Sequence, residues 1–595
     1  MGLYSGLTKQ KRTKNYSDRE LFIRYIKRLA PFKKSIYLIS LFIVISTVSD
    51  IFNPLLVGWG VDELTSGTPN LLLILLIAIS YVFFSGIIWL MFYLRRREYG
   101  KFVPYFLENL RMDIFDKIQE QDMSFFDYYQ SGALNTRITN DALDFGDTTS
   151  LIAETGGNFL ISILTFFILA YLNLFLALIA LAAVPIVLLL MFSLRKLARS
   201  VSRAYRKAIE RVNDAMIESV EGVHVAKSYG QEATISNKFL EVNKSYFKSN
   251  FKLTAVTHLW RHLLNIIASI TILIIIYYSG LFVIQGNITP GVIVTFILYL
   301  QGFFRPIIVL ATFFPQLSTG MAAYERILEV IDSEPELKQN PKSADITNIR
   351  GEVLFDNVGF YYIDNNWVLK NFNLKIKSGE KLAIVGHTGA GKTSIISLIN
   401  RFYEFQEGSI KIDGMDIRKL PLKTFRDQVG TVQQDVFLFS GTIDENVRYG
   451  KPKATEEELW NAIKTVHAEE IINYLPEGLN TYIGERGKGL SMGQKQIISF
   501  ARAILSDPKI LILDEATSSV DAYTEAIIQE ALEELLKNRT SIIIAHRLST
   551  IINADRIIVL DHGKLVEEGT HDSLLRKGGK YSKLYQQYFQ HQLLD

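Results

Sequence analysis

The C-terminal half of the chain is organised around one stretch, Leu382-Ala383-Ile384-Val385-Gly386-His387-Thr388-Gly389-Ala390-Gly391-Lys392-Thr393-Ser394. An apolar run short enough for a buried parallel strand precedes the pattern G-x-x-x-x-G-K-T, and a helical pattern continues to Ile399. This order of strand, loop and helix is the context that a phosphate-binding loop requires. The pattern therefore favours binding of ATP or GTP over an ordinary glycine-rich turn.

Each residue type in this loop has a chemical reason to be there. The glycines let backbone N–H groups turn inward around an anion, and the N-terminus of the following helix adds its positive dipole end. Lys392 is expected to reach the terminal phosphates, and the hydroxyl of Thr393 can hold Mg²⁺. We assign the whole loop to nucleotide binding: Gly386, His387, Thr388, Gly389, Ala390, Gly391, Lys392, Thr393 and Ser394.

Composition narrows the class of protein. The chain has 595 residues, which predicts two or three domains, and its net charge of +3 gives no indication of a nucleic-acid partner. There is no cysteine, so neither a disulfide framework nor a thiolate metal site is possible. The basic N-terminus lacks an apolar core followed by a cleavage site, so we expect no removed signal peptide.

The N-terminal half predicts a membrane domain. Residues 1–30 combine many basic residues with apolar residues at helical spacing, which indicates an amphipathic helix on the cytoplasmic face of a membrane. Six apolar segments follow, and several exceed the ~18 residues that distinguish a membrane span from a buried helix of a soluble core. The predicted spans are Ile36–Trp59, Leu71–Leu94, Phe159–Leu172, Leu174–Leu194, His262–Ile284 and Gly291–Phe314.

The charges between the spans predict orientation. The joins at 60–70 and 285–290 contain no Lys or Arg, whereas 99–147 and 195–257 are rich in both. Positively charged segments stay on the cytoplasmic side, so both termini and the C-terminal domain are expected there. We expect a domain of six transmembrane helices at 31–331, a proline-containing linker at 332–350, and an α/β P-loop NTPase domain at 351–595.

Two further strand ends in the C-terminal domain carry polar residues. Lys509 to Leu513 is an apolar strand that ends in Asp514 and Glu515. Alone, such an acidic pair could be a surface turn. In the same domain as a phosphate loop, we expect Asp514 to hold Mg²⁺ through water and Glu515 to polarise the attacking water. His546 ends another strand, and a lone histidine there is more often structural.

Together these features resemble the half-transporters of the ATP-binding cassette (ABC) exporter family, of the multidrug or lipid exporter type, from about Leu21 to the C-terminus. The resemblance implies that two such chains dimerise and that two ATP and Mg²⁺ sites form where their nucleotide domains close head to tail. It also implies the roles of individual residues: Tyr362 stacks on adenine, Gln434 reaches Mg²⁺, Asp514 and Glu515 form the second nucleotide motif, Asp521 lies in the loop that crosses the dimer, and His546 is the switch histidine.

The family signature L-S-G-G-Q corresponds to Leu490 to Gln494, with one departure. Ser491, Gly493 and Gln494 match, but Met492 replaces the first glycine. Such an imperfect signature beside intact acids is similar to the hydrolysing half of heterodimeric exporters. We therefore favour a heterodimer with a second half-transporter, while a homodimer stays open.

The resemblance also suggests where two helices couple the domains. The family's coupling helices are expected at 140–143 and 229–232, although both segments could equally be solvated helix turns. Within the spans, Asp50 and Arg305 are ionisable, which makes each a candidate for the substrate cavity or for a structural role. Their expected depths differ by roughly 15 Å, too far for a direct pair.

The predicted function is ATP-driven export of amphipathic or hydrophobic compounds, drug-like or lipid-like, across the cell membrane by alternating access. An ATP-gated channel, a regulatory subunit, or an exporter specific for one lipid or peptide would share these motifs. An importer half is disfavoured, because importers of this superfamily resemble separate membrane and nucleotide chains.

Overall fold

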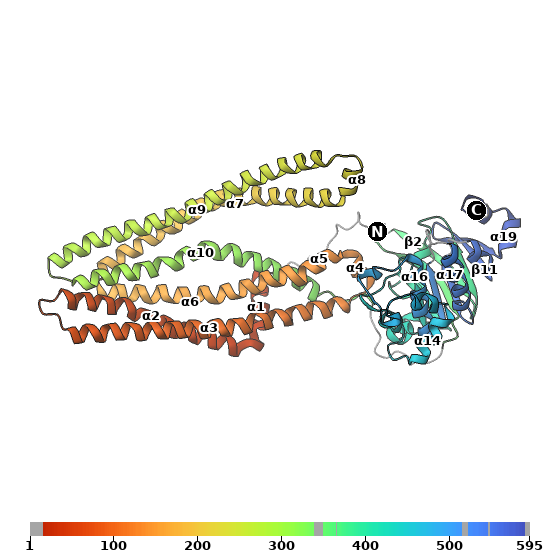
Figure 1. Cartoon of the computed structure of the whole chain (residues 1–595), viewed down its shortest axis with the longest axis horizontal. Helices are drawn as coiled ribbons and strands as arrows, with labels where there is room; N and C mark the ends of the chain where they lie inside the picture. The colour runs from red at the N-terminus through yellow and green to blue at the C-terminus, as the bar shows by residue number, and fades with distance from the viewer. Residues whose placement is uncertain (1–15, 338–348, 364–365, 515–521, 545–547, 589–595) are drawn as a thin grey trace. The chain divides into compact units, whose positions relative to one another are not determined.

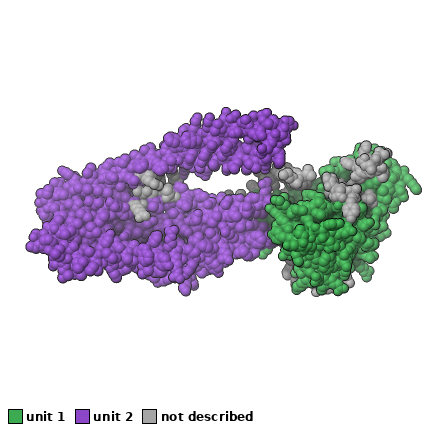
Figure 2. Space-filling view, in the orientation of Figure 1, with its two compact units in different colours: residues 1–6, 120–129, 334–595 green, residues 7–119, 130–333 purple. Residues whose placement is uncertain are grey.

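The structure is a computed structural model that describes residues 16–337, 349–363, 366–514, 522–544 and 548–588. The chain divides into two compact units (Figure 2). Unit 1 comprises residues 1–6, 120–129 and 334–595, and unit 2 comprises residues 7–119 and 130–333. The short segment 120–129 therefore belongs with the C-terminal part of the chain, although both of its ends continue into unit 2.

Unit 2 consists of long helices (Figure 1). Asn173 separates two of them, because its extended backbone ends one helix while its side chain caps the next by accepting a hydrogen bond from Leu176 N at 3.1 Å. This is the tight break that the sequence predicts. The helices are α1 (Asp18–Leu29), α2 (Lys33–Thr65), α3 (Leu71–Gln119), α5 (Ser131–Thr136), a π-helical turn (Arg137–Asp141), α6 (Ala142–Leu172), α7 (Leu174–Glu221), α8 (Val223–Ser228), α9 (Glu232–Ile284) and α10 (Pro290–Ile331).

Every predicted span lies within one of the long helices of unit 2. Within the described part of the chain, four helical segments are long and apolar enough to cross a membrane, and they contain α2, α3, α6 and α9. The described parts of α7 and α10 carry shorter apolar stretches, Leu174–Leu190 and Pro290–Phe304. The helices continue well past the apolar segments, so most of the polar sequence expected in the cytoplasm extends the same helices.

The N-terminal helix α1 has two faces. Ser17 caps it by accepting from Glu20 N at 3.2 Å, and Leu21 and Tyr25 are buried against the rest of unit 2. Phe22 and Ile26 lie on the other face and are exposed. This distribution suits a helix that packs on the domain with one side and meets lipid with the other.

Unit 1 is built on a six-stranded sheet in the order β12-β11-β3-β10-β9-β6, with a four-stranded antiparallel sheet in the order β2-β1-β4-β5. The strands are β1 (Val353–Tyr361), β2 (Trp367–Ile376), β3 (Lys381–Val385), β4 (Glu407–Ile412), β5 (Met415–Asp416), β6 (Val429–Val432), β7 (Gly441–Thr442), β8 (Tyr482–Ile483), β9 (Ile510–Asp514), β10 (Thr540–Ile544), β11 (Arg556–Asp561) and β12 (Lys564–Gly569).

Helices and apolar side chains cover both faces of the larger sheet. Along β3, Leu382 and Ile384 belong to one core cluster, and Ala383 and Val385 belong to the other. This explains why the strand is a continuous apolar run. The helices of unit 1 are α4 (Met123–Tyr128), α11 (Lys392–Ile399), α12 (Leu422–Arg426), α13 (Ile443–Arg448), α14 (Glu456–Thr465), α15 (Glu469–Asn473), α16 (Met492–Ser506), α17 (Ala522–Leu535), α18 (Leu548–Ile552), α19 (His571–Lys577) and α20 (Lys580–Tyr588).

Candidate nucleotide-binding site

The phosphate loop connects β3 to α11, in the order that the sequence predicts. Gly389 and Gly391 have φ angles of +84° and +102°, a backbone conformation that strains any residue with a side chain. Gly386 is needed for a different reason, because a Cβ there would lie 2.5 Å from the carbonyl oxygen of Leu560. Around Gly389, by contrast, an added Cβ would meet nothing within 4 Å. The loop is thus packed at its base and open at its tip.

Lys392 begins α11 and turns its ammonium group back over the loop. The Nζ atom donates to the carbonyl oxygen of Gly386 and, at 3.2 Å, to that of His387. Burial lowers the pKa of Lys392, and the carboxylate of Asp514 acts in the opposite direction. The cation therefore lies at the loop, close enough to Asp514 for an electrostatic interaction, where phosphate oxygens could replace the two carbonyls as partners.

Parallel pairing brings the other polar residues to the same edge of the sheet. Asp514 is in register with Ile544 on β10, which in turn pairs with Ile384 on β3. On the other side of β9, Val432 pairs with Leu513, and Gln434 follows two residues later as an exposed side chain. The carboxyl ends of parallel strands are where ligands bind in such sheets.

Three residues expected at this site lie outside the described part of the chain: Glu515, Asp521 and His546.

Tyr362 lies beside the first turn of α11. Its hydroxyl donates to Ser394 Oγ at 3.1 Å. Its ring meets Phe360 edge-on at 4.7 Å and Tyr403 edge-on at 5.0 Å between centroids. Sequence reasoning missed Tyr403, because its neighbours in this cluster are distant in the chain.

The signature segment forms the start of α16. Ser491 and Gln494 make a capping box: Ser491 Oγ accepts from Gln494 N at 3.2 Å, and Gln494 Oε1 accepts from Ser491 N at 2.9 Å. Met492 is the first helical residue and its side chain is 51% exposed, whereas Gly493 is buried. The departure from the family signature therefore places a flexible apolar side chain at a helix N-terminus, the kind of position that favours anions.

The chemistry of the donors suits Mg²⁺. Thr393, Gln434 and Asp514 offer a hydroxyl, an amide oxygen and a carboxylate, and Mg²⁺ takes oxygen ligands in this way, usually one or two carboxylates together with phosphates. Among the described residues, no group of three or more His, Cys, Asp or Glu side chains could hold a metal by itself. A metal that binds together with a nucleotide fits this set better than a preformed protein cage.

One expected coupling segment is wrong. Asn140–Leu143 lies in unit 2, where Asp141 is 4% exposed and accepts from Arg326 Nη2 at 2.5 Å and from Nε at 3.0 Å. This ion pair, in which Asp141 is buried and the Arg326 side chain is partly exposed, ties the π-helical turn to α10. The segment of the membrane half that associates with unit 1 is Glu120–Tyr129 instead. The second expected segment, 229–232, lies where α8 meets α9 and stays a prediction.

The two ionisable residues of the spans are closer in depth than expected. The register of α2 against α10 is set by hydrogen bonds from Gly291 N to Asp62 Oδ1 (2.6 Å), from Thr295 Oγ1 to Pro54 O (3.2 Å) and from the Tyr299 hydroxyl to Ile51 O. Asp50 thus lies near the level of Tyr299. Arg305 is six residues further along α10 than Tyr299, so it differs in depth from Asp50 by ~9 Å at ~1.5 Å per residue, rather than by ~15 Å. The expectation failed because α2 continues beyond Trp59 to Thr65; the side chain of Arg305 lies outside the description.

Comparison with known proteins agrees with this geometry. The family model for the ABC transporter transmembrane region matches residues 36–307, and the ABC transporter model matches residues 369–518. The uncharacterized ABC transporter ATP-binding protein YknV of Bacillus subtilis is 39% identical, over 96% of this chain and 94% of its own length.

Two further relatives have names that specify a cargo. A fatty acid ABC transporter ATP-binding/permease protein of Mycobacterium bovis is 37% identical, over 80% of this chain and 75% of its own length. An ATP-dependent lipid A-core flippase of Syntrophus aciditrophicus is also 37% identical, over 81% of this chain and 80% of its own length.

Among solved structures, a bacterial Atm1-family ABC exporter with ATP bound superposes with a TM-score of 0.79 at 27% identity, covering 93% of this chain and 99% of its own. Both domains are therefore shared with an exporter that binds ATP. The chain belongs to the ABC exporter family, as a multi-pass membrane half-transporter whose membrane domain and ATP-hydrolysing domain are joined in one polypeptide.

Proposed function

We propose that the protein exports an amphipathic, lipid-like compound across the cell membrane by alternating access, driven by ATP hydrolysis in its cytoplasmic nucleotide domain. The observation that carries this proposal is the common sheet edge at which the phosphate loop, Gln434 and Asp514 meet, in a chain that also supplies the membrane helices. The names of two relatives, a fatty acid transporter and a lipid A-core flippase, support the lipid-like cargo.

In this proposal, each residue of the site has one task. Lys392 exchanges its loop carbonyls for the terminal phosphates of ATP, and the N–H groups between Gly386 and Thr393 bind the anion. Thr393, Gln434 and Asp514 hold Mg²⁺, which neutralises charge on the phosphates when it is bound. Glu515 polarises the attacking water, and His546 contacts the terminal phosphate. Tyr362 stacks on adenine.

The active assembly contains a second half-transporter. The cytoplasmic parts of α7 and α9 expose large apolar side chains that a monomer would leave in water, and Figure 2 shows an opening within unit 2 between this pair of helices and the rest of the unit. We infer a heterodimer, because Met492 in the signature segment leaves one ATP site imperfect. The exposed side chains are Met216, Ile217 and Val220 on α7, Leu240, Phe247 and Phe251 on α9, and, where the two helices are joined, Val225 on α8 and Tyr229 after it.

The experiment that tests the cargo class measures ATPase activity in vesicles of defined composition. The purified chain, alone and with a co-expressed half-transporter, is reconstituted and exposed to a panel of fatty acids, phospholipids, peptides and drug-like amphiphiles. Fatty acids or other lipids are expected to stimulate hydrolysis several-fold more than peptides. Equal stimulation by every amphiphile, or stimulation by peptides alone, would reject the lipid-like cargo.

A further inference from the structure

Strand β11 lies directly beside the strand that leads into the phosphate loop. It pairs in parallel with β3, and Val559 is in register with Val385 at the end of that strand. One residue further on, the two segments are in close contact, because a Cβ on Gly386 would lie 2.5 Å from the carbonyl oxygen of Leu560. Asp561 is the last residue of β11. Its carboxylate is therefore delivered to the same sheet edge as the phosphate loop.

The turn after β11 also contacts the loop. The backbone N–H of Gly563 donates to the carbonyl oxygen of Ala390 at 3.0 Å. The carboxylate of Asp561 lies close enough to His387 for an electrostatic interaction. Neighbouring strands are ~4.8 Å apart, so this carboxylate lies roughly two strand spacings, ~10 Å, from phosphates bound in the loop. A negative charge at that distance would weaken the binding of a polyphosphate unless a cation offset it.

The cation comes from the C-terminal helix α20. The ammonium group of Lys580 donates to Asp561 Oδ2, and the two side chains are 55% and 27% exposed. This ion pair holds the pKa of Asp561 below its ordinary value, so the carboxylate is ionised near neutral pH. His562 Nε2 lies 3.8 Å from the other carboxylate oxygen, but the histidine side chain is 95% exposed. Lys580 is therefore the group that neutralises Asp561.

The first turn of α20 is fixed to β12. The carboxylate of Glu567 accepts from the backbone N–H groups of Lys580, at 2.7 Å, and Tyr581, at 3.0 Å. Gly579 permits this close approach, because a Cβ there would lie 2.1 Å from Glu567 Oε1. Tyr581 is 1% exposed and belongs to the same apolar cluster as Val385. The packing of α20 against the sheet thus holds the ammonium group in place.

We propose that Lys580 is a positioning residue for nucleotide binding: by neutralising Asp561, it maintains the affinity of the phosphate loop for the phosphates of ATP. This inference rests on the proposed function, in which the loop from Gly386 to Ser394 binds those phosphates. The cation lies 19 positions after its partner, on a helix outside the loop. The C-terminal helix thereby takes part in setting nucleotide affinity through charge.

An effect of charge has a sign that a loss of structure does not share. Lys580→Ala leaves the carboxylate unneutralised and should raise the Kd for MgATP by ~3–10-fold at ~10 mM ionic strength. At ~1 M, where the Debye length is ~3 Å, the same variant should differ from the unmodified chain by less than ~1.5-fold. Lys580→Gln keeps a hydrogen-bond donor without the charge and should behave like Lys580→Ala. Asp561→Asn removes the repulsion and should leave the Kd unchanged or lower it.

The experiment measures the Kd for MgATP on the full-length chain in nanodiscs, at both ionic strengths, by competition against a fluorescent ATP analogue. The double variant Lys580→Ala/Asp561→Asn should return to within ~2-fold of the unmodified chain, because both charges are then absent. Lys451→Ala is the matched control: it removes a lysine that is 48% exposed and pairs with Glu458 at 2.7 Å in the same unit. Thermal unfolding verifies that each variant is folded.

Lys392→Ala separates this inference from the proposed function. If Lys392→Ala leaves the Kd for MgATP unchanged, the assignment of the phosphate loop is wrong and the inference falls with it. If Lys392→Ala weakens binding while Lys580→Ala does not, the role of Lys580 alone is overturned. Equal losses of affinity in Lys580→Ala and Asp561→Asn, at both ionic strengths, would show that the ion pair only supports the fold and would also overturn it.

Discussion

Replacement of Met492 by glycine tests whether the departure from the family signature limits hydrolysis. The side chain of Met492 is 51% exposed at the first position of α16. Removing the buried part of this side chain lowers the free energy of unfolding by about 1 kcal/mol. The backbone entropy of glycine in a helix lowers it by at most about 1 kcal/mol more. The capping box of Ser491 and Gln494 remains, so the helix should still form.

Met492→Gly should raise ATPase turnover, although it lowers the free energy of unfolding slightly. A hydrogen bond to a charged group contributes about 1.5–3 kcal/mol, and closer approach of phosphate to the helix N-terminus should recover roughly half of one such bond. A gain of ~0.75–1.5 kcal/mol in the stabilisation of the transition state corresponds to a ~4–13-fold rise in turnover.

The assay is ATPase turnover at saturating ATP for the chain purified alone in lipid nanodiscs, with thermal unfolding measured in parallel. Ser491→Ala is the control, because it removes the cap and the signature hydroxyl together; it should lower turnover and destabilise the helix by about 1 kcal/mol. A folded Met492→Gly variant with unchanged turnover would refute the reasoning, and robust cooperative ATPase of the unmodified chain alone would refute the heterodimer.

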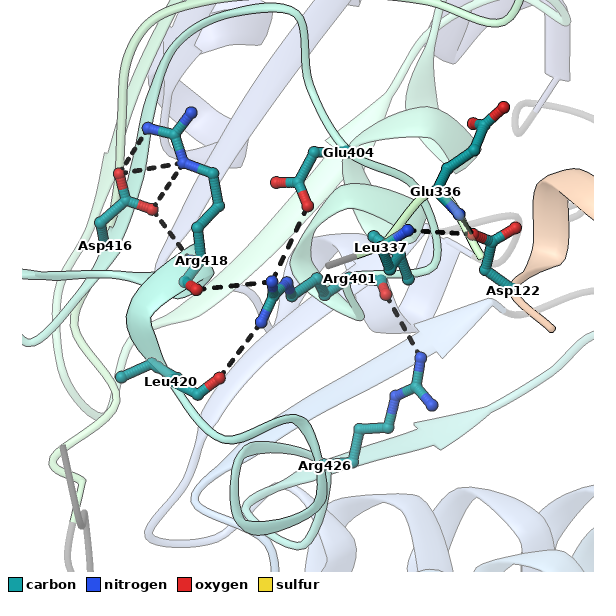
Figure 3. A network of polar contacts seen from close by, with 9 residues as sticks. All are labelled: Asp122, Glu336, Leu337, Arg401, Glu404, Asp416, Arg418, Leu420 and Arg426. Atoms are coloured by element: carbon teal, nitrogen blue, oxygen red, sulfur yellow. Dashed lines mark hydrogen bonds and ion pairs between the residues drawn. The ribbon is translucent and has the colours of Figure 1, made fainter. Parts of the chain in front are cut away.

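Three other substitutions test separate parts of the account. Glu515→Gln should leave ATP binding intact and slow hydrolysis by ~10²-fold or more, because it removes the carboxylate that polarises water; near-normal turnover would reject that role. Arg305→Ala should alter substrate-stimulated ATPase more than basal ATPase, with Arg305→Lys as the charge-conserving control, and an equal fall in both rates would favour a structural role. Arg401→Met should lower the free energy of unfolding by about 1–3 kcal/mol, because the buried guanidinium donates to the carbonyl oxygen of Leu420 at 3.1 Å and lies 3.8 Å from the half-buried Glu404 carboxylate (Figure 3), and adding Glu404→Gln should restore part of the loss in thermal denaturation. No change in the unfolding of the single variant would contradict this.

The features that the sequence predicts well are those encoded in local patterns. The strand, loop and helix around Gly386 to Ser394 follow from an apolar run and a glycine motif, and the break at Asn173 follows from one polar residue between two apolar runs. The position of these residues at one sheet edge follows from a general rule, because Asp514 is the last residue of β9 and Gln434 follows β6 by two residues.

Features that depend on distant partners could not be predicted in this way. The hydrogen bond between Asp127 and Tyr403 joins residues 276 positions apart, and nothing in either neighbourhood marks the pair. The mistaken coupling segment at Asn140–Leu143 has the same origin: its polar composition suits a surface turn, but Asp141 is buried by an ion pair with Arg326, 185 positions away. Local polarity cannot distinguish a solvated residue from a buried one with a partner.

The most direct test of the central claim is ATP-driven movement of a fatty-acyl lipid across a bilayer. Proteoliposomes containing the chain and its partner half-transporter are loaded with a fluorescent acyl lipid, and the fraction in the leaflet facing away from the nucleotide domains is followed by dithionite quenching. The account predicts that this fraction rises with Mg²⁺ and ATP and does not rise with a non-hydrolysable analogue or with Glu515→Gln. An equal rate with the non-hydrolysable analogue, or no lipid movement despite active hydrolysis, would contradict it.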